Sequence, residues 1–571
     1  MTEYAGINLW DWLALAAYLV VVTGIGLWTA SKIKDTADFF MGGRGFGKIS
    51  MIFFAFGAGT NGNQAVGVAS KTYTNGLSGI WYQWLWLFAT PFYWLIAPAF
   101  RRMRAITTGD YFEYRYSRSV AGLYTVVGVM QLTVNIGVML LGSAKVIEAI
   151  SGGAIPSTYS VIVMTILFVA YGMAGGLAAA IVTDLIQGIL TVILSFMILP
   201  FALKAVGGFA GLHESITDES MFSLVAPGEI NGWHISIFAL NAALGIVTQP
   251  HIMGVCAAGR TEMDGRVGFA AGNLLKRVCT VAWMLTGLCG VVYFMNNGGD
   301  AVEPDQVYGR MAGELLPLVM PGLVGVFLAA LLASVMSSCD AFMVSSAGLV
   351  TQNLYRRYLA PDRDEKHYVT VGRIAGLVIV TFSVFFAYTV EDIPSGLETF
   401  WKIQGMMAAT FWVGLFWRRA TPAGAWASTL GAFSVMLFTD SPMFHGWAAA
   451  NLSDFFLWDG EFRQCFQMAA YLSTGFGLCI IVSLFTPRLP KAKLDRFYMC
   501  LHTPVNAEEA HMPEPFMLPE DVEPVEPRKL INHPDMEFPV PSLIGLGGFA
   551  FFWVCVGAMI WFVFNMAQWG A

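Results

Sequence analysis

Long apolar segments recur along almost the whole chain, and they constrain its fold more than any other feature. An α-helix needs about 20 mainly apolar residues to cross the hydrocarbon core of a bilayer. Segments of this kind lie at 8–30, 49–70, 78–100, 120–149, 158–178, 179–203, 233–256, 269–295, 320–353, 369–389, 395–416, 422–440, 464–486 and 541–567. We therefore predict an all-α polytopic membrane protein with about 14 transmembrane helices.

The composition supports a lipid-covered surface. Apolar residues make up 56% of the 571 residues and charged residues 12%, whereas soluble domains have about 45–50% and about 25%. The first apolar segment lacks the basic start and small-residue cleavage site of a signal peptide, so we interpret it as a retained helix. The eight cysteines form no CxxC pair, and no basic patch is suited to nucleic acid.

The Lys and Arg residues support this count of helices and indicate an orientation. If the N-terminus lies outside, 24 of the 32 basic residues fall in inner loops and only Lys71, Lys204, Arg310 and Arg463 in outer segments. Such an excess follows the positive-inside rule. We predict a multi-pass protein of the plasma (inner) membrane, with the N-terminus outside and the Pro- and Glu-rich loop 487–540 in the cytoplasm. That loop cannot bury enough apolar area to fold alone, so we expect a polar linker to the last helix.

Polar and glycine residues interrupt the second apolar segment at mid-membrane depth. Residues 57–64 read GAGTNGNQ, a composition that is poor for a continuous helix in lipid. Unwound backbone is tolerated there only where it is buried in protein or lines a cavity. We favour a broken helix, with freed carbonyls available to a cation or a solute; a small-residue packing face is the alternative.

Three serines share one face of the ninth segment. Ser334, Ser337 and Ser338 lie at positions i, i+3 and i+4 of the expected helix, so their side chains project from the same side. A hard cation such as Na⁺ prefers oxygen ligands, which hydroxyls and freed carbonyls supply. Alternatively, a serine cluster of this kind can pack one helix against another.

Two aspartates, Asp184 and Asp340, fall inside apolar segments. An ionised carboxylate at this depth costs several kcal/mol or more unless it is paired or coordinates a cation. A functional role is therefore our expectation for both, although Asp184 lies near the inner end of its helix, where it could also reach water.

Together with these residues, several motifs resemble the sodium:solute symporter family over nearly the whole chain. They are FFMGGR at 39–44, YGMAGG at 171–176 followed by TDLIQ at 183–187, the Ser337-Ser338 helix ending in LYRRY at 354–358, and GLFWRR at 414–419. The resemblance implies a transporter with a LeuT-like core of two inverted five-helix repeats.

The resemblance also divides the chain into segments. It places an extra helix and loop at 1–48, the first repeat at 49–203, an external loop at 204–232 and the second repeat at 233–416. Accessory helices at 417–486, the cytoplasmic polar linker at 487–540 and the last transmembrane helix at 541–571 follow.

By resemblance, Na⁺ is the coupling ion and binds between the first and eighth core helices. The implied ligands are backbone oxygens at Gly57, Thr60 and Ser334 and the hydroxyls of Ser337 and Ser338. In some members a second Na⁺ uses an aspartate that matches Asp184 together with two serines, at positions that here hold Asp340 and Ala341. We therefore predict that Asp184 and Asp340 hold a second cation, either Na⁺ or H⁺.

The solute-binding residues implied by the family's sugar carriers match Gln64, Asn241 and Lys276. Gln83 replaces a glutamate of that branch, and the position of its aromatic inner gate holds Leu244. From its place in the tenth core helix, we add Gln404 as a candidate. The sequence QPHI at 249–252 resembles the proline-type branch instead.

We expect Na⁺-coupled symport of a small polar organic solute by alternating access, with a sugar, polyol or sugar acid as the solute. An amino acid or a monocarboxylate is the alternative. A channel would need a continuous polar stripe, a sensor a soluble domain of about 150 residues, and an enzyme a nucleophile–base pair or metal cluster; the sequence displays none of these.

Overall fold

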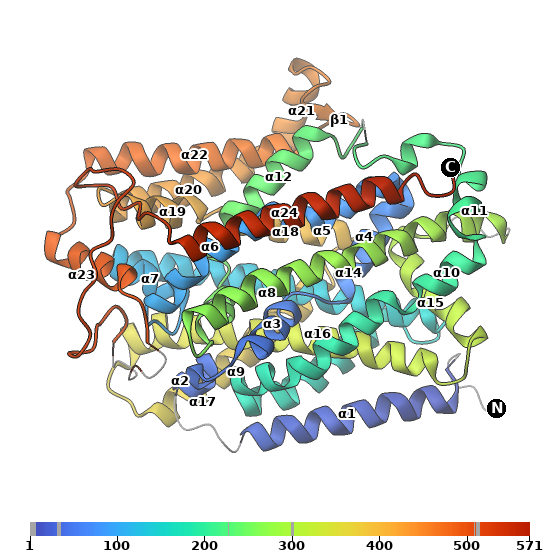
Figure 1. Cartoon of the computed structure of the whole chain (residues 1–571), viewed down its shortest axis with the longest axis horizontal. Helices are drawn as coiled ribbons and strands as arrows, with labels where there is room; N and C mark the ends of the chain where they lie inside the picture. The colour runs from blue at the N-terminus through green and yellow to red at the C-terminus, as the bar shows by residue number, and fades with distance from the viewer. Residues whose placement is uncertain (1–6, 31–35, 227, 298–301, 507–508, 510–513) are drawn as a thin grey trace.

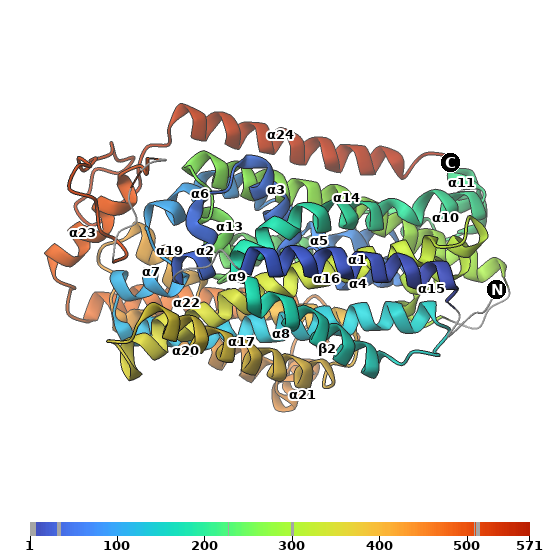
Figure 2. The ribbon, with the colours of Figure 1, turned by 90° about the horizontal axis from the view of Figure 1, so that it is seen from below.

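Most helices of the computed structural model lie along the long axis of the molecule (Figure 1). The structure describes residues 7–30, 36–226, 228–297, 302–506, 509 and 514–571. The first described residues and the C-terminus lie at one end of this bundle, and α23 (Lys491–His502) lies at the other (Figures 1 and 2).

The first half of the chain forms α1 (Leu9–Ala30), α2 (Thr36–Met41), α3 (Lys48–Gly57), α4 (Gly62–Asn75), α5 (Trp81–Trp84), α6 (Thr90–Arg102), α7 (Thr108–Arg115), α8 (Arg118–Ile150), α9 (Ser157–Met197), α10 (Leu199–Ala205), α11 (Gly208–Ser215), α12 (Gly232–Gly245) and α13 (Ile252–Ala257). Short 3₁₀ turns lie at Gly42–Arg44, Gly76–Ile80, Glu219–Phe222 and Ile246–Thr248.

The second half forms α14 (Glu262–Asn296), α15 (Val307–Leu315), α16 (Leu323–Gly348) with a π-helical extension (Leu349–Leu359), α17 (Glu365–Ala387), α18 (Ile393–Gly405), α19 (Ala408–Phe416), α20 (Pro422–Thr439), α21 (Pro442–Asn451), α22 (Gln464–Phe485), α23 (Lys491–His502) and α24 (Leu543–Met566). Further 3₁₀ turns lie at Pro304–Gln306 and Leu316–Leu318, and β1 (Leu457–Trp458) pairs antiparallel with β2 (Glu461–Phe462).

Seven segments of the described residues are long and apolar enough to cross a membrane without interruption. They are Arg118–Ile150, Ala180–Ala205, Glu262–Asn296, Leu323–Leu359, Glu365–Ala387, Gln464–Phe485 and Leu543–Met566. Other predicted segments correspond to shorter helices or to helices broken by turns, as at 58–61 and 406–407. The polytopic helical fold is confirmed, while the count of fourteen stays a prediction.

Residues 157–197 are helical throughout, across the boundary that we placed near residue 178. The apolar parts on either side, Ser157–Ala170 and Ala180–Ala205, match the two predicted segments.

The outer surface of the bundle is apolar. Helix α24 lies along one side of the bundle, as Figure 2 shows, and exposes large apolar side chains such as Leu543 (88% exposed) and Val554 (70%). A contiguous surface of this kind is unfavourable in water and is covered by lipid in a membrane protein.

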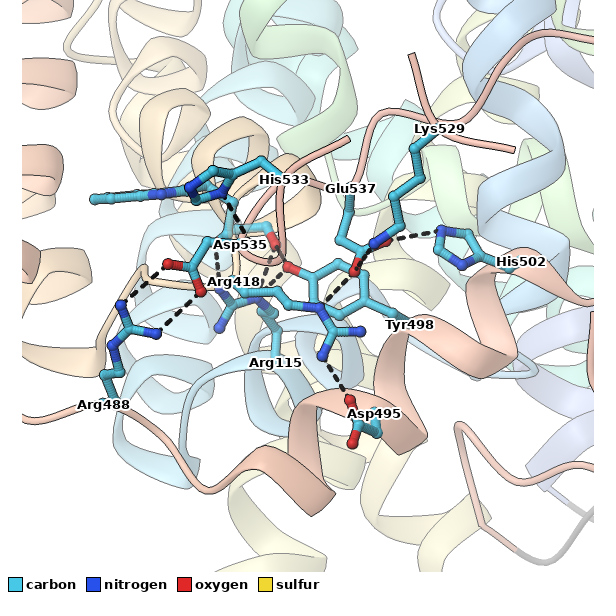
Figure 3. Close-up of polar contacts among 12 residues, drawn as sticks. Arg115, Arg418, Arg488, Asp495, Tyr498, His502, Lys529, His533, Asp535 and Glu537 are labelled. Carbon is cyan, nitrogen blue, oxygen red and sulfur yellow. Dashed lines mark hydrogen bonds and ion pairs between the residues drawn. The ribbon is translucent and has the colours of Figure 1, made fainter. Parts of the chain in front are cut away.

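The 487–540 segment packs against one end of the bundle instead of forming a free tether. Phe516 is fully buried, and its N–H donates to the carbonyl of Met103, which directly follows α6 (3.0 Å). Arg418, two residues after the end of α19, forms ion pairs with Asp495 and Glu537 (Figure 3). Composition alone did not indicate this packing, because the partners of the polar residues lie on distant helices.

Glu537 is the centre of this network. Its side chain is 1% exposed, pairs with Arg418 and Lys529, and lies 3.7 Å from the ring of His502. Its N–H also donates to the carbonyl of Phe416 (2.9 Å). Because removing one partner from a buried ion pair leaves an uncompensated charge, the contacts attach the 487–540 segment firmly to α19.

We predict that His502 makes the folded protein less stable in acid. Burial lowers the pKa of His502 to about 4 from its ordinary 6.5, with Glu537 opposing the shift and nearby Lys529, Arg102 and Arg418 adding to it. The unfolded chain therefore binds a proton at His502 between pH 6.5 and about 4 that the folded chain does not, so stability falls as the pH falls through this range. His502→Asn should flatten this part of the melting temperature against pH, measured in detergent; parallel curves for the two proteins would contradict the prediction.

Candidate functional site

The first core helix is broken between α3 and α4, as the glycine-rich sequence indicates. Residues 58–61 are not helical, and Gly59 has a φ of +102°. This backbone conformation strongly favours glycine because other residues would strain there. The predicted break in the 49–70 segment is confirmed.

Ser338 on α16 partners the freed backbone at the break. Its hydroxyl donates to the carbonyl of Gly57 (2.7 Å) and accepts from the N–H of Gly59 (3.1 Å) and the side-chain amide of Asn61 (3.3 Å). Buried backbone groups require such partners. The structure thus brings two predicted ion-binding positions, 57 and 338, into direct contact.

Ser337 connects the same site to α9. Its hydroxyl donates to Asp184 Oδ1 at 2.5 Å, and both residues are buried. A Cβ atom added at Gly57 would lie 2.6 Å from Ser337 Oγ and 3.4 Å from Asp184 Cγ. Gly57 therefore allows α3, α9 and α16 to approach closely around these oxygens.

Several oxygens near the break have no hydrogen-bond partner among the described residues. They include Thr60 Oγ1, Asn61 Oδ1 and Asp184 Oδ2, all buried. The hydroxyl of Ser334 donates to the carbonyl of Leu331 in its own helix (2.7 Å). Unsatisfied buried oxygens of this kind fit a dehydrated alkali cation, which prefers oxygen ligands.

Asp340 is fully buried and lies three residues after Ser337 on α16. Since residues three apart share a helical face, it projects from the same side of the helix as Ser337. Asp184 and Asp340 thus reach this region from different helices.

A second helix is also broken, which we did not expect in the 233–256 segment. Helix α12 continues as a 3₁₀ turn to Thr248, and α13 begins only at Ile252. Pro250, in the QPHI motif, is the sequence signal for this break, because proline cannot donate a helical hydrogen bond.

A small central cavity of about 40 Å³ lies between the two breaks. Polar side chains from α4, α8 and α14 meet residues of the second break there. The lining residues are Ala55, Ala58, Gly59, Gln64, Trp86, Asn135, Ile246, Gln249, His251, Ile252, Val255, Phe269, Asn273, Lys276, Arg277, Phe342, Leu397 and Phe400. Sequence analysis missed Asn135, Gln249, Asn273 and Arg277, whose neighbours in space lie far away in the chain.

Two of the predicted solute-binding residues line this cavity directly. The amide of Gln64 donates to the carbonyl of Gly59 (2.6 Å), and the ammonium of Lys276 donates to the same carbonyl. Gln404 reaches the cavity through Gln249, whose Nε2 donates to Gln404 Oε1 (2.6 Å).

The other two predicted solute-binding residues lie behind the cavity wall. The amide of Gln83 is buried, and its backbone carbonyl accepts from Arg277. Asn241 donates to the carbonyl of Trp401 (3.0 Å) and accepts from Tyr471 (2.9 Å), so both ends of its amide have protein partners.

A larger cavity of about 540 Å³ lies beyond the central one, and the two share no lining residue. Its lining holds six acidic side chains: Glu229, Glu303, Asp305, Asp392, Glu398 and Glu461. Aromatic contacts lie between the cavities, with the ring of Trp401 5.4 Å from that of Tyr82 and 5.8 Å from that of Trp86. Tyr82 donates to Glu398 at the floor of the larger cavity (2.6 Å).

Comparison with known proteins identifies relatives across the chain. The sodium/glucose cotransporter of Vibrio parahaemolyticus is 24% identical over 471 residues, covering 76% of this chain and 85% of that protein. The osmoregulated proline transporter OpuE of Bacillus subtilis (strain 168) is 26% identical over 441 residues, covering 75% and 88%.

The fold has a counterpart among solved structures. A Na⁺-coupled sialic acid symporter in a substrate-bound outward-open state superposes with a TM-score of 0.69 at 16% identity, over 85% of this chain and 99% of that one. This similarity supports the LeuT-like fold. The model of the sodium:solute symporter family matches residues 39–431, more than half of the chain. The protein therefore belongs to the sodium:solute symporter family and is a multi-pass membrane transporter that uses Na⁺ as its coupling ion.

Proposed function

We propose that the protein carries a sugar, a polyol or a sugar acid together with Na⁺. The observation that supports this solute class is the set of neutral amide side chains on the central cavity: Gln64, Asn135, Gln249 and Asn273. Amides both donate and accept hydrogen bonds, so they suit the hydroxyl groups of a polyhydroxylated solute.

An amino acid or a monocarboxylate is the second candidate. Lys276 and Arg277 on the cavity wall favour it, because each provides a positive charge for a carboxylate. The sequence relatives that carry glucose and proline leave both classes open.

We propose that Na⁺ binds where α3 ends, between α3 and α16. Gly57 and Ser334 contribute backbone carbonyls, Thr60 contributes oxygen from the break, and Ser337 and Ser338 contribute hydroxyls. The hydrogen bond from Ser338 to the Gly57 carbonyl supports this assignment, since it brings two of the proposed ligand oxygens within 2.7 Å of each other.

We further propose that Asp184 and Asp340 hold a second cation, Na⁺ or H⁺. Both carboxylates are fully buried, and Asp184 has an oxygen without a hydrogen-bond partner. Two carboxylates in one low-dielectric region either hold a cation between them or share a proton.

The inverted repeats at 49–203 and 233–416 remain part of the proposal. Each has its first helix broken, at 58–61 and at 249–251, as expected for two copies of one unit in opposite orientations. Alternating access then exposes the central site first to one side of the membrane and then to the other. We place the membrane protein in the plasma (inner) membrane, with the N-terminus outside and 487–540 in the cytoplasm, at the opposite end of the bundle.

Uptake into proteoliposomes tests the proposed symport. An imposed Na⁺ gradient should accumulate the solute unchanged above its external concentration, whereas a channel would only equilibrate it and an enzyme would alter it. Accumulation without a Na⁺ gradient, from an equal Na⁺ concentration on both sides, would contradict the coupling.

Ser338→Ala should weaken Na⁺ binding without changing which solute is chosen. The variant loses a hydroxyl that contacts both ends of the break, and a hydrogen bond to a charged group contributes about 1.5–3 kcal/mol, which is about tenfold or more in affinity. The Na⁺ concentration for half-maximal uptake should rise accordingly. An altered solute preference at unchanged Na⁺ dependence would overturn the assignment.

Gly57→Ala should abolish Na⁺-dependent uptake, because its Cβ would lie 2.6 Å from Ser337 Oγ beside Asp184. Gly47→Ala, just before the same helix, is the matched control, since an added Cβ there meets no atom within 4 Å. Equal Na⁺ dependence of the two variants would rule out an ion site at this position.

The second cation can be tested by stoichiometry. We expect two cations per solute in the wild type and one after Asp340→Ala, measured from the reversal potential of uptake. A ratio of one cation per solute, with Na⁺ and H⁺ counted together, before and after the substitution would rule out the second site.

A further inference from the structure

Among the described residues, the wall of the central cavity holds the lysine and arginine side chains Lys276 and Arg277, together with His251, and no acidic side chain. Lys276 and Arg277 are consecutive on α14, and both line the cavity. Their exposed fractions are 8% and 1%. The neutral lining residues include four amides, so the wall combines hydrogen-bonding groups with an excess of positive charge.

Within the described part of the chain, neither cation forms an ion pair with a carboxylate. Lys276 donates to the carbonyl of Gly59, and Arg277 donates to the carbonyl of Gln83 with its guanidinium 5.6 Å from the centre of the Trp86 ring. The Nε of Arg277 is buried without a hydrogen-bond partner. Burying charges in this way costs several kcal/mol per ion, so an anion supplied from outside would be strongly favoured.

The break separates this positive wall from the negative ion site. A Cβ at Gly59 would lie 3.6 Å from Lys276 Nζ, and one at Gly57 would lie 3.4 Å from Asp184 Cγ. The backbone of 57–59 therefore runs between the two groups of charges. The ammonium of Lys276 donates a hydrogen bond to the carbonyl of Gly59, and the N–H of Gly59 donates to the hydroxyl of Ser338.

The two adjacent cations indicate an anionic solute, because they lack a carboxylate partner among the described residues. One carboxylate has two oxygens, one for the ammonium of Lys276 and one for the guanidinium of Arg277, whose planar shape matches a carboxylate in geometry. The amides of Gln64, Asn135, Gln249 and Asn273 remain for hydroxyl groups.

We propose that the solute is a hydroxylated monocarboxylate whose carboxylate binds between Lys276 and Arg277. This inference rests on the proposed function and narrows its two candidate solute classes to one, the hydroxylated monocarboxylates, which include sugar acids and hydroxy acids. When the carboxylate draws the Lys276 ammonium away from the carbonyl of Gly59, the backbone of the break changes its contacts beside the proposed Na⁺ ligands. Na⁺ and the solute should therefore each tighten binding of the other. The cavity must widen beyond its present 40 Å³ to admit such a solute.

The larger cavity, although it is lined by six acidic side chains, is compatible with an anionic solute because several of these carboxylates are paired with cations or accept hydrogen bonds. Glu229 pairs with Lys71 (2.8 Å), Asp305 with Lys145 (3.3 Å), and Glu398 accepts from Tyr82 and Gln464. The remaining negative charge concentrates Na⁺ at the entrance.

Thermal unfolding of the purified full-length protein, in Na⁺ and in choline buffers, tests the proposal. The probes are glucuronate against glucose, lactate against propane-1,2-diol, and inorganic phosphate. We expect a carboxylate to raise the melting temperature in Na⁺ while its uncharged counterpart does not. A shift by glucose or propanediol, a shift by phosphate alone, or no shift by either carboxylate would overturn the proposal.

Two variants and a control test whether Lys276 and Arg277 bind the carboxylate of the solute. Lys276→Met should raise the carboxylate concentration for a half-maximal shift by at least about tenfold, because it removes a buried charge partner. Arg277→Lys should raise this concentration less, since the positive charge stays while the planar pair of guanidinium donors is lost. Lys402→Met, whose lysine pairs with Asp440 outside the central cavity (2.9 Å), should behave as wild type. Equal effects of Lys276→Met and Lys402→Met would overturn the assignment.

Stabilisation by Na⁺ alone separates this inference from the proposed function. If Na⁺ stabilises the wild type but not Ser338→Ala, the ion site stands even where the carboxylate assignment fails. If Na⁺ stabilises neither, the proposed ion site fails first.

Discussion

The break in the first core helix is the feature on which the rest of the site depends. Unwinding at 58–61 frees backbone groups at a depth where water cannot satisfy them. The structure provides partners from distant helices: Ser338 on α16 bonds to Gly57 and Gly59, and Lys276 on α14 bonds to Gly59. The same few residues therefore stabilise the unwound backbone and lie at both the proposed ion site and the central cavity.

Charge is divided across this break. Carboxylates lie on the side of α9 and α16, and cations lie on the side of α14. In a low-dielectric interior such a division is costly without ligands of opposite sign, and the proposed Na⁺ and carboxylate would each supply the missing charge on one side. In the proposed mechanism Na⁺ and the solute are coupled through Gly59, which is hydrogen-bonded both to Ser338 at the proposed ion site and to Lys276 on the cavity wall.

The 487–540 segment packs against the end of the bundle that lies away from the C-terminus. It contacts α6 through Phe516 and the end of α19 through Glu537 and Arg418. Any movement of α6 relative to α19 would therefore strain the contacts that this segment makes with both helices. This is how a segment of unremarkable polar composition takes part in the packing of the transport core (Figure 3).

The sequence by itself determined the helical membrane fold, the position of the first break and the face shared by Ser334, Ser337 and Ser338. These follow from helix period and from the cost of polar groups in lipid, both of which are local properties. Only the tertiary structure decided which side chains meet: that Lys276 and Arg277 face the cavity while Lys402 pairs with Asp440, and that Asn241 is already bonded to Trp401 and Tyr471. Such pairings depend on helices that are far apart in the chain and adjacent only after packing.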